Sequence, residues 1–72
     1  MTWHPVDLAI LRAATMWPGT VGKHEIAARF GLSPRTVKNR ATVLGRLGHV
    51  EPGRWRYVAT PQGVEQWQRL NP

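Results

Sequence analysis

The sequence predicts a single small domain, residues 1–72, that is mainly α-helical and carries one short β-hairpin. Three observations predict this fold class. Four segments place apolar residues at helical spacing between recognisable start and stop signals. A Pro-Gly pair is followed by residues that alternate in character, as in a strand. The 72 residues are 42% hydrophobic, which is enough for one small core.

The first two helices are expected over residues 4–17 and 23–30. Pro5 suits the first turn of a helix, and the pair at positions 18 and 19, Pro-Gly, ends the first segment. The second segment has Glu25 three residues after a candidate N-cap, Gly22. Helical spacing predicts that the following side chains face the core: Leu8, Leu11, Ala14 and Thr15, flanked by Ile10 and Trp17, and then Ile26, Ala27 and Phe30.

A third helix is expected over residues 34–48. Ser33 can cap its free amides, and Gly48 is the expected terminator. At 100° per residue the segment has two different faces. The apolar face holds Val37, Ala41, Leu44 and Leu47. The polar face holds Arg35, Lys38, Asn39, Thr42 and Arg46.

The hairpin is expected over residues 49–59 and a last helix over residues 61–70. Pro52 and Gly53 fit the centre of a type II turn. Strand alternation directs Trp55, Tyr57 and Ala59 inward and Arg54, Arg56 and Val58 outward. Inward packing is the favoured role of the two aromatic residues, and stacking on nucleic-acid bases is the alternative. The last helix begins at Thr60-Pro61, and its apolar side holds Val64, Trp67 and Leu70.

Charge and composition indicate which class of ligand the protein binds. The chain has 10 Lys and Arg against 4 Asp and Glu, a net charge of +6. Six of the basic residues and one acid lie between positions 34 and 56, so +5 of the excess falls on the third helix and hairpin. Such concentration is typical of nucleic-acid binding. With no cysteine and no metal-ligand spacing among His4, His24 and His49, neither a metal nor a cofactor is expected.

Neither an enzyme nor a membrane protein is expected. The acidic residues are isolated from one another, and the only serine, Ser33, has a capping role. The longest aliphatic run, residues 8–11, is far shorter than the roughly 20 residues of a membrane helix. Since the N-terminus also lacks the pattern of a secretory signal, we expect a cytoplasmic protein, associated with the nucleoid through DNA.

The order of elements and several motifs resemble a known family. Residues 25–37 resemble the helix-turn-helix of bacterial regulators, with Ala27 in the first helix, Gly31 in the turn and Val37 as an anchor. The remainder, through Tyr57-Val58-Ala59-Thr60-Pro61-Gln62-Gly63, is similar to the winged version, especially MarR-like repressors. The resemblance runs from about Leu8 to Leu70 and implies a three-helix core, a short wing and a C-terminal helix. The long dimerisation helices of that family have no counterpart, so no small-molecule effector is expected.

This resemblance implies sequence-specific binding of double-stranded DNA by a small transcriptional regulator, with the third helix in the major groove and the hairpin on the backbone. Arg35 and Asn39 are the candidates for base edges. Arg40 is an open case, equally suited to crossing the core edge and to touching DNA. If about five phosphates are neutralised, log affinity should fall with log salt at a slope of roughly −4 to −5. The full candidate set is Ser33, Pro34, Arg35, Thr36, Lys38, Asn39, Thr42, Arg46, Arg54 and Arg56.

Other readings remain open at this point. A winged helix can serve as a protein-interaction module, here for an acidic partner, or as an architectural component of DNA packaging or recombination. The small size is compatible with a phage or mobile-element origin. A homodimer is a further alternative, with Trp67 and Leu70, or Trp3, as the candidate seam.

Overall fold

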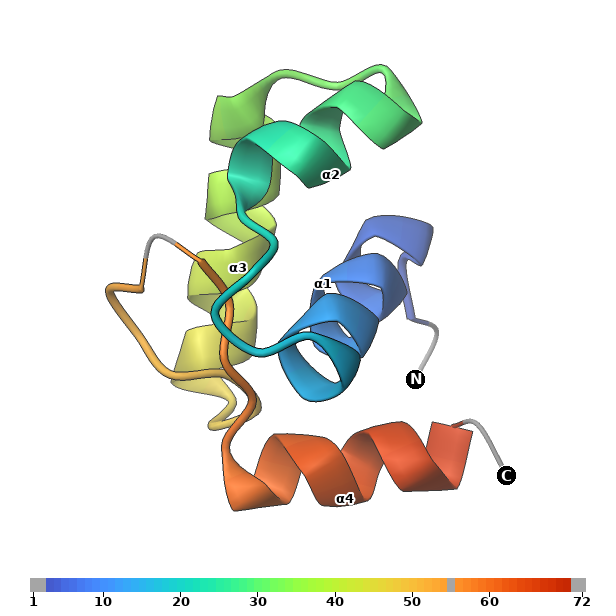
Figure 1. Ribbon diagram of the computed structural model, residues 1–72, viewed down its shortest axis with the longest axis vertical. Helices are drawn as coiled ribbons and strands as arrows, with labels where there is room; N and C mark the ends of the chain where they lie inside the picture. Colours follow the sequence, from blue (N-terminus) through green and yellow to red (C-terminus); the bar gives the residue numbers. More distant parts are fainter. Residues whose placement is uncertain (1–2, 55, 71–72) are drawn as a thin grey trace.

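The computed structural model describes residues 3–54 and 56–70, which form four helices within about 28 × 23 × 20 Å. The helices are α1 (Pro5–Met16), α2 (Lys23–Phe30), α3 (Pro34–Arg46) and α4 (Pro61–Leu70). Helix α1 packs against all three others, and in the view of Figure 1 α2 lies above it, α4 below it and α3 to its left. The mainly helical class is therefore confirmed, with little strand.

Helix α1 begins at Pro5, one residue later than expected, and buries only part of the expected stripe. The His4 Nδ1 atom accepts a hydrogen bond from the Val6 amide at 3.1 Å, and Pro5 opens the first turn. The expected stripe was partly wrong, because Leu8 is only half-buried and Trp17 is exposed. Helix α1 packs against α2, α3 and α4, and its buried residues are Val6, Asp7, Ile10, Leu11, Ala13 and Ala14.

Helices α2 and α3 are joined by a three-residue turn. The Gly22 amide, just before α2, donates to Glu25 Oε2 at 3.2 Å. Gly31 ends α2 with φ of +65°, a left-handed conformation that glycine adopts without strain. Ile26 and Ala27 are buried, but the expectation that Phe30 faces the core was wrong: it is exposed, because the chain turns away directly after it.

Helix α3 ends at Arg46, two residues earlier than expected. Gly48 still acts as the terminator, with φ of +81°. Its amide donates to the Gly45 carbonyl and the His49 amide donates to the Leu44 carbonyl, which is the Schellman arrangement. Leu47, the C-cap residue of α3, is exposed, contrary to its expected place in the core.

The residues from 47 to 60, here called the 47–60 connection, contain antiparallel pairing at isolated positions. Val50 pairs with Ala59, and the Glu51 amide donates to the Val58 carbonyl at 2.9 Å. Among the described residues no continuous two-stranded ladder forms, so the expected hairpin is reduced to these bridges. The second half of the expected hairpin pairs with a different part of the chain, because Arg56 forms a bridge with Gly22 in the α1–α2 link. The inward placement expected for Trp55 lies outside the described residues.

Helix α4 is fixed at its first turn. The Gly63 amide donates to Thr60 Oγ1 at 3.0 Å, while the Thr60 hydroxyl donates to the Gly48 carbonyl. Gly63 also lies directly against the backbone of His49. A Cβ atom at position 63 would lie only 1.8 Å from the His49 carbonyl oxygen. This close approach requires glycine and holds the start of α4 against the residues that follow α3.

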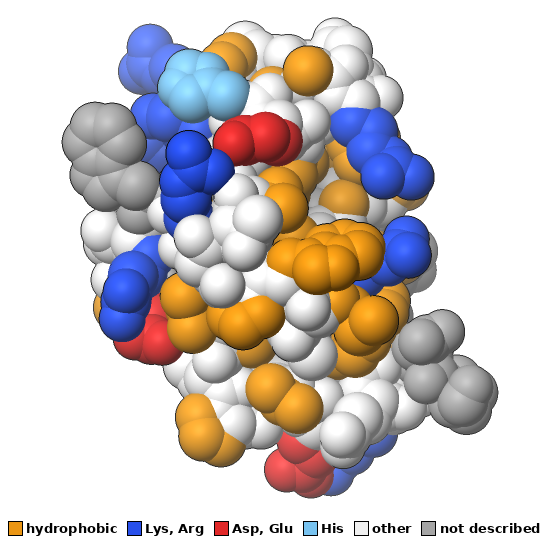
Figure 2. Space-filling model, viewed as in Figure 1, with side chains coloured by type: hydrophobic (Ala, Val, Ile, Leu, Met, Phe, Trp, Pro, Cys, Tyr) orange, Lys and Arg blue, Asp and Glu red, His pale blue; other side chains and the backbone are white. Residues whose placement is uncertain are grey.

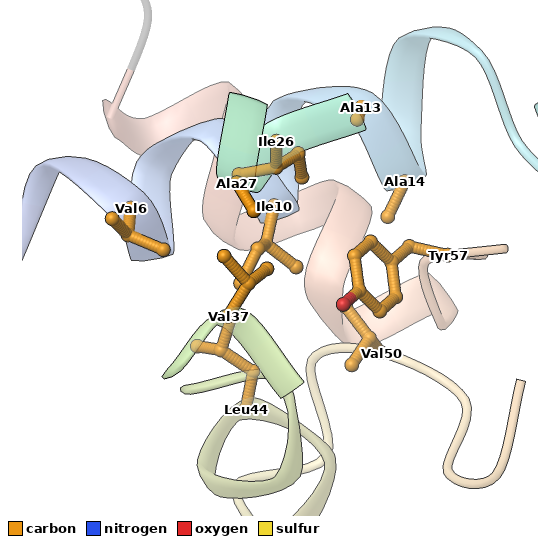
Figure 3. Packing of buried hydrophobic residues seen from close by; sticks show 10 residues of the cluster. All are labelled: Val6, Ile10, Ala13, Ala14, Ile26, Ala27, Val37, Leu44, Val50 and Tyr57. Atoms are coloured by element: carbon orange, nitrogen blue, oxygen red, sulfur yellow. The ribbon is translucent and has the colours of Figure 1, made fainter. Parts of the chain in front are cut away.

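The core lies between α1 and the elements around it. Ile10 from α1 and Val37 from α3 are fully buried, and Ile10 lies between Val37 and Ala27 (Figure 3). Tyr57 and Val50 bring the 47–60 connection into the same cluster. In the described part of the chain, no helix is both long and apolar enough to cross a membrane.

Candidate nucleic-acid interface

The exposed side of α3 carries a polar surface that we call the α3 outer face. Helical geometry places Arg35, Asn39 and Arg46 in one row, while Lys38 and Thr42 flank it. Every one of these side chains is exposed, as expected from the sequence. The helix contains no acidic residue, so nothing within α3 offsets its positive charge. The α3 outer face can therefore donate hydrogen bonds to an anionic ligand.

Two side-chain hydroxyl groups stabilise the first turn of α3. Ser33 Oγ accepts from the Thr36 amide at 3.3 Å, and the two hydroxyls share a hydrogen bond of 3.0 Å. Pro34 occupies the first helical position. Ser33 and Thr36 are both exposed, so the structure leaves them accessible at the end of α3 where the helix dipole is positive.

Arg40 lies apart from the α3 outer face and is held against α1. Its Nε atom donates to Asp7 Oδ1 at 2.8 Å and its Nη2 atom to Asp7 Oδ2 at 2.6 Å. The hydrogen bond to Asp7, followed by the charge of that carboxylate, raises the pKa of Arg40. Of the two roles considered for Arg40, the structure shows the one at the core edge. The bidentate pair fixes α3 on α1.

Asp7 lies in the first turn of α1, where a carboxylate interacts favourably with the helix dipole, and its pairing with Arg40 is a second role. A signal for its second role was present, because Asp7 shares the buried stripe of Ile10 and Ala14 at spacings of three and four. A carboxylate on such a stripe needs a cationic partner. Periodicity identifies that need, but it does not identify Arg40, which lies 33 residues away.

The two arginines of the 47–60 connection are paired with acids. Arg54 donates to Glu51 Oε1 at 3.1 Å. Arg56 donates to the Thr20 carbonyl at 2.6 Å and to Glu25 Oε1 at 3.2 Å. Both arginines are exposed, as the strand alternation predicted, but the ion pairs were not expected. They leave the connection with less available positive charge than the sequence indicated.

Glu25 has a structural reason to stay ionised. Hydrogen bonds from backbone amides, that of Glu25 itself and that of Gly22, lower the pKa of this carboxyl, and the charge of Arg56 contributes. Glu25 therefore remains a partner for Arg56 at neutral pH. Because the pair is solvent-exposed, an incoming phosphate can compete for the guanidinium at small cost.

A groove of about 690 Å³ connects these elements, and we call it the polar groove. Its floor includes Ala41, Gly45, Val50 and Tyr57. Its walls come from α3, from the start of α2 and from the 47–60 connection, and their basic groups are Lys23, His24, Lys38, Arg46, Arg54 and Arg56. Lys23 and His24 were not among the predicted site residues, because sequence spacing alone does not bring the start of α2 beside α3.

Lys and Arg side chains gather along the edge of the molecule formed by α3 and the 47–60 connection (Figure 2). Within residues 3–54 and 56–70, no group of three histidines or acids is close enough to hold a metal ion. Trp3 packs on the ring of His49 at a centroid distance of 5.5 Å, so this residue contributes to the fold next to the core. When the chain is compared with models of known protein families and with curated protein sequences, no match is found.

Proposed function

We propose that this protein is a minimal winged helix-turn-helix protein that binds double-stranded DNA and regulates transcription. In this proposal α3 enters the major groove and the 47–60 connection, acting as the wing, lies against the sugar-phosphate backbone. The α3 outer face supports the proposal more than any other observation. It combines three exposed cations with an exposed Asn on a helix that has no acid.

The residue types suit different parts of the duplex. Arg35 and Asn39 are close to the exposed start of α3 and have the side chains that read guanine and adenine edges. Lys38 and Arg46 are suited to phosphates on either side. Ser33, Pro34, Thr36 and Thr42 would support these contacts from the same helix end and flank.

The ion pairs of the 47–60 connection change the expected salt dependence. Arg35, Lys38, Arg46 and Lys23 make no ion pair with any residue in the described ranges, whereas Arg54 and Arg56 do. Four neutralised phosphates give a slope of log affinity against log salt of roughly −3 to −4. If Arg54 and Arg56 exchange their carboxylates for phosphates, the slope becomes steeper by about one for each.

Fluorescence anisotropy with a labelled duplex tests the proposal across a series of salt concentrations. Arg35→Ala should relax the base preference at one position, and Arg54→Ala should weaken all duplexes alike. Arg69→Gln is the matched control, because it removes an exposed charge from α4, which does not contact α3. Binding with a slope near zero, or equal losses in Arg35→Ala and Arg69→Gln, would contradict the proposal.

Selection of bound sequences from a random duplex pool tests the regulatory part of the proposal. A preferred sequence is expected, because Arg35 and Asn39 carry base-reading groups. Strong, salt-dependent binding without any preferred sequence would instead indicate an architectural role in packaging or recombination.

A further inference from the structure

A second groove lies on another face of the molecule, between α1, α2 and α4. Its volume is about 540 Å³, and we call it the apolar groove. Leu8 lines it from α1, Trp17 from the position directly after α1, and Phe30 from the end of α2. Trp67 and Leu70 line it from α4. Among the residues that the structure describes, only Glu25 lines both this groove and the polar groove. The apolar groove is therefore separate from the α3 outer face.

The apolar groove leaves large side chains open to solvent. Trp17 is 46% exposed, Phe30 is 38% exposed and Leu70 is 37% exposed. Figure 2 shows hydrophobic side chains gathered across the middle of this face, with Lys and Arg beside them. In a domain this small, leaving a Trp, a Phe and a Leu together at a groove forgoes apolar burial that folding could use. Such a patch is typical of an interaction surface.

The charge at the edge of the groove identifies the kind of partner. Arg12 and Arg29 line it from α1 and α2, and the one acid among the described lining residues, Glu25, is paired with Arg56. Within the described ranges neither guanidinium takes part in an ion pair, and Arg12 lies over the Trp17 ring at 5.3 Å. A second copy of the chain would bring the same two cations and a net charge of +6 to the interface. This repulsion disfavours a homodimer and favours an acidic occupant.

We propose that the apolar groove binds an acidic amphipathic helix of a partner protein. Its apolar side chains, at spacings of three and four, would pack on Trp17, Phe30 and Trp67, and its carboxylates would pair with Arg12 and Arg29. A helix of about 12–15 residues is long enough to span this face of the domain. Because the groove and the α3 outer face are separate, the protein can hold this partner and a second ligand together.

The probe is a fluorescein-labelled synthetic helix with Leu at positions i, i+3, i+4 and i+7 and with Glu elsewhere. Saturable binding to the full chain is expected by fluorescence anisotropy. Two control peptides separate the contribution of the apolar side chains from that of the negative charge. The first has Gln in place of Leu and keeps the charge, so it should lose binding if the groove contributes. The second has Lys in place of Glu and should bind more weakly.

Variants of the chain locate the contact. Arg12→Gln and Arg29→Gln should each weaken the acidic peptide about three- to fivefold, as expected for exposed ion pairs. Arg69→Gln removes a charge outside the groove and should change the affinity by less than Arg12→Gln. All three positions are exposed, so the variants are expected to fold, and a thermal melt checks this.

Amide chemical-shift mapping with the same peptide decides where it binds. The proposal expects the largest shifts in α1, α2 and α4. It is overturned if the shifts concentrate on α3, if the Gln-substituted peptide binds equally well, or if sedimentation shows a dimer and the peptide produces no shifts in α1, α2 and α4. None of these readouts depends on DNA binding, so this proposal can fail or succeed independently of the proposed function.

Discussion

Removing Arg40 from its ion pair with Asp7 should lower the free energy of unfolding by more than removing Asp7 does. The Asp7 side chain is only 7% exposed, whereas that of Arg40 is 40% exposed. Arg40→Met therefore leaves a buried carboxylate without a cation, while Asp7→Leu leaves a guanidinium that can turn to water. The first loss should be the larger one.

The magnitudes follow from this difference in burial. Removing one member of a fully buried pair costs about 3–5 kcal/mol, and water reaching the open side reduces the loss for Arg40→Met to about 2–4 kcal/mol. For Asp7→Leu we expect about 1–2 kcal/mol, the cost of a lost charged hydrogen bond. A domain of this size has a total stability of roughly 4–10 kcal/mol, so Arg40→Met should remove a large part of it.

The double variant completes the cycle. With Leu at position 7 and Met at position 40, two apolar side chains replace the pair and no charge stays buried. The double variant should therefore be more stable than Arg40→Met alone. Urea unfolding followed by far-ultraviolet circular dichroism gives the free energies of unfolding. The reasoning is refuted if Arg40→Met costs no more than Asp7→Leu, or if the two single losses simply add.

Two further predictions concern pH and packing. Burial, followed by the charge of a nearby carboxylate, raises the pKa of Tyr57 to about 12. This pKa is above that of tyrosine in the unfolded chain, so the contribution of the protonated side chain to stability is fully present below about pH 10. As the pH rises to about 12, the free energy of unfolding should fall by about 2–3 kcal/mol. Tyr57→Phe should remove this loss, and the absorbance of the only tyrosine reports the titration, so an ordinary pKa would contradict the prediction. Gly63→Ala should destabilise by more than about 2 kcal/mol, since its Cβ would meet a backbone carbonyl, as overpacking predicts. Gly45→Ala, where the nearest atom would be 3.7 Å away, should stabilise by up to about 1 kcal/mol, and equal thermal shifts in the two variants would contradict this.

The charge of the site was predictable in part. Helical periodicity was enough to identify the α3 outer face, because residues three and four apart on a helix must share a side. The same reasoning placed Arg54 and Arg56 on the solvent side of their segment. It did not reveal that Glu51 and Glu25 pair with them, because the second of these contacts joins residues 31 positions apart.

Local sequence by itself determined where the helices begin and end. His4, Ser33 and Thr60 accept hydrogen bonds from amides within three residues of themselves, and Gly31 and Gly48 terminate helices through their own backbone conformation. These effects do not depend on the remainder of the chain, so the bounds of α2 and α4 agree with the prediction.

Only the tertiary structure decided which apolar residues are covered. A periodic stripe shows that a helix has an apolar side, but the width that is buried depends on the neighbours that pack there. Phe30 and Trp17 extend beyond those neighbours and become the apolar groove, while Asp7 falls inside and takes Arg40 as its partner. The pairing of Arg56 with Gly22, which reduced the expected hairpin, was decided in the same way. Each of these outcomes is a contact between distant parts of the chain, and local spacing does not specify such contacts.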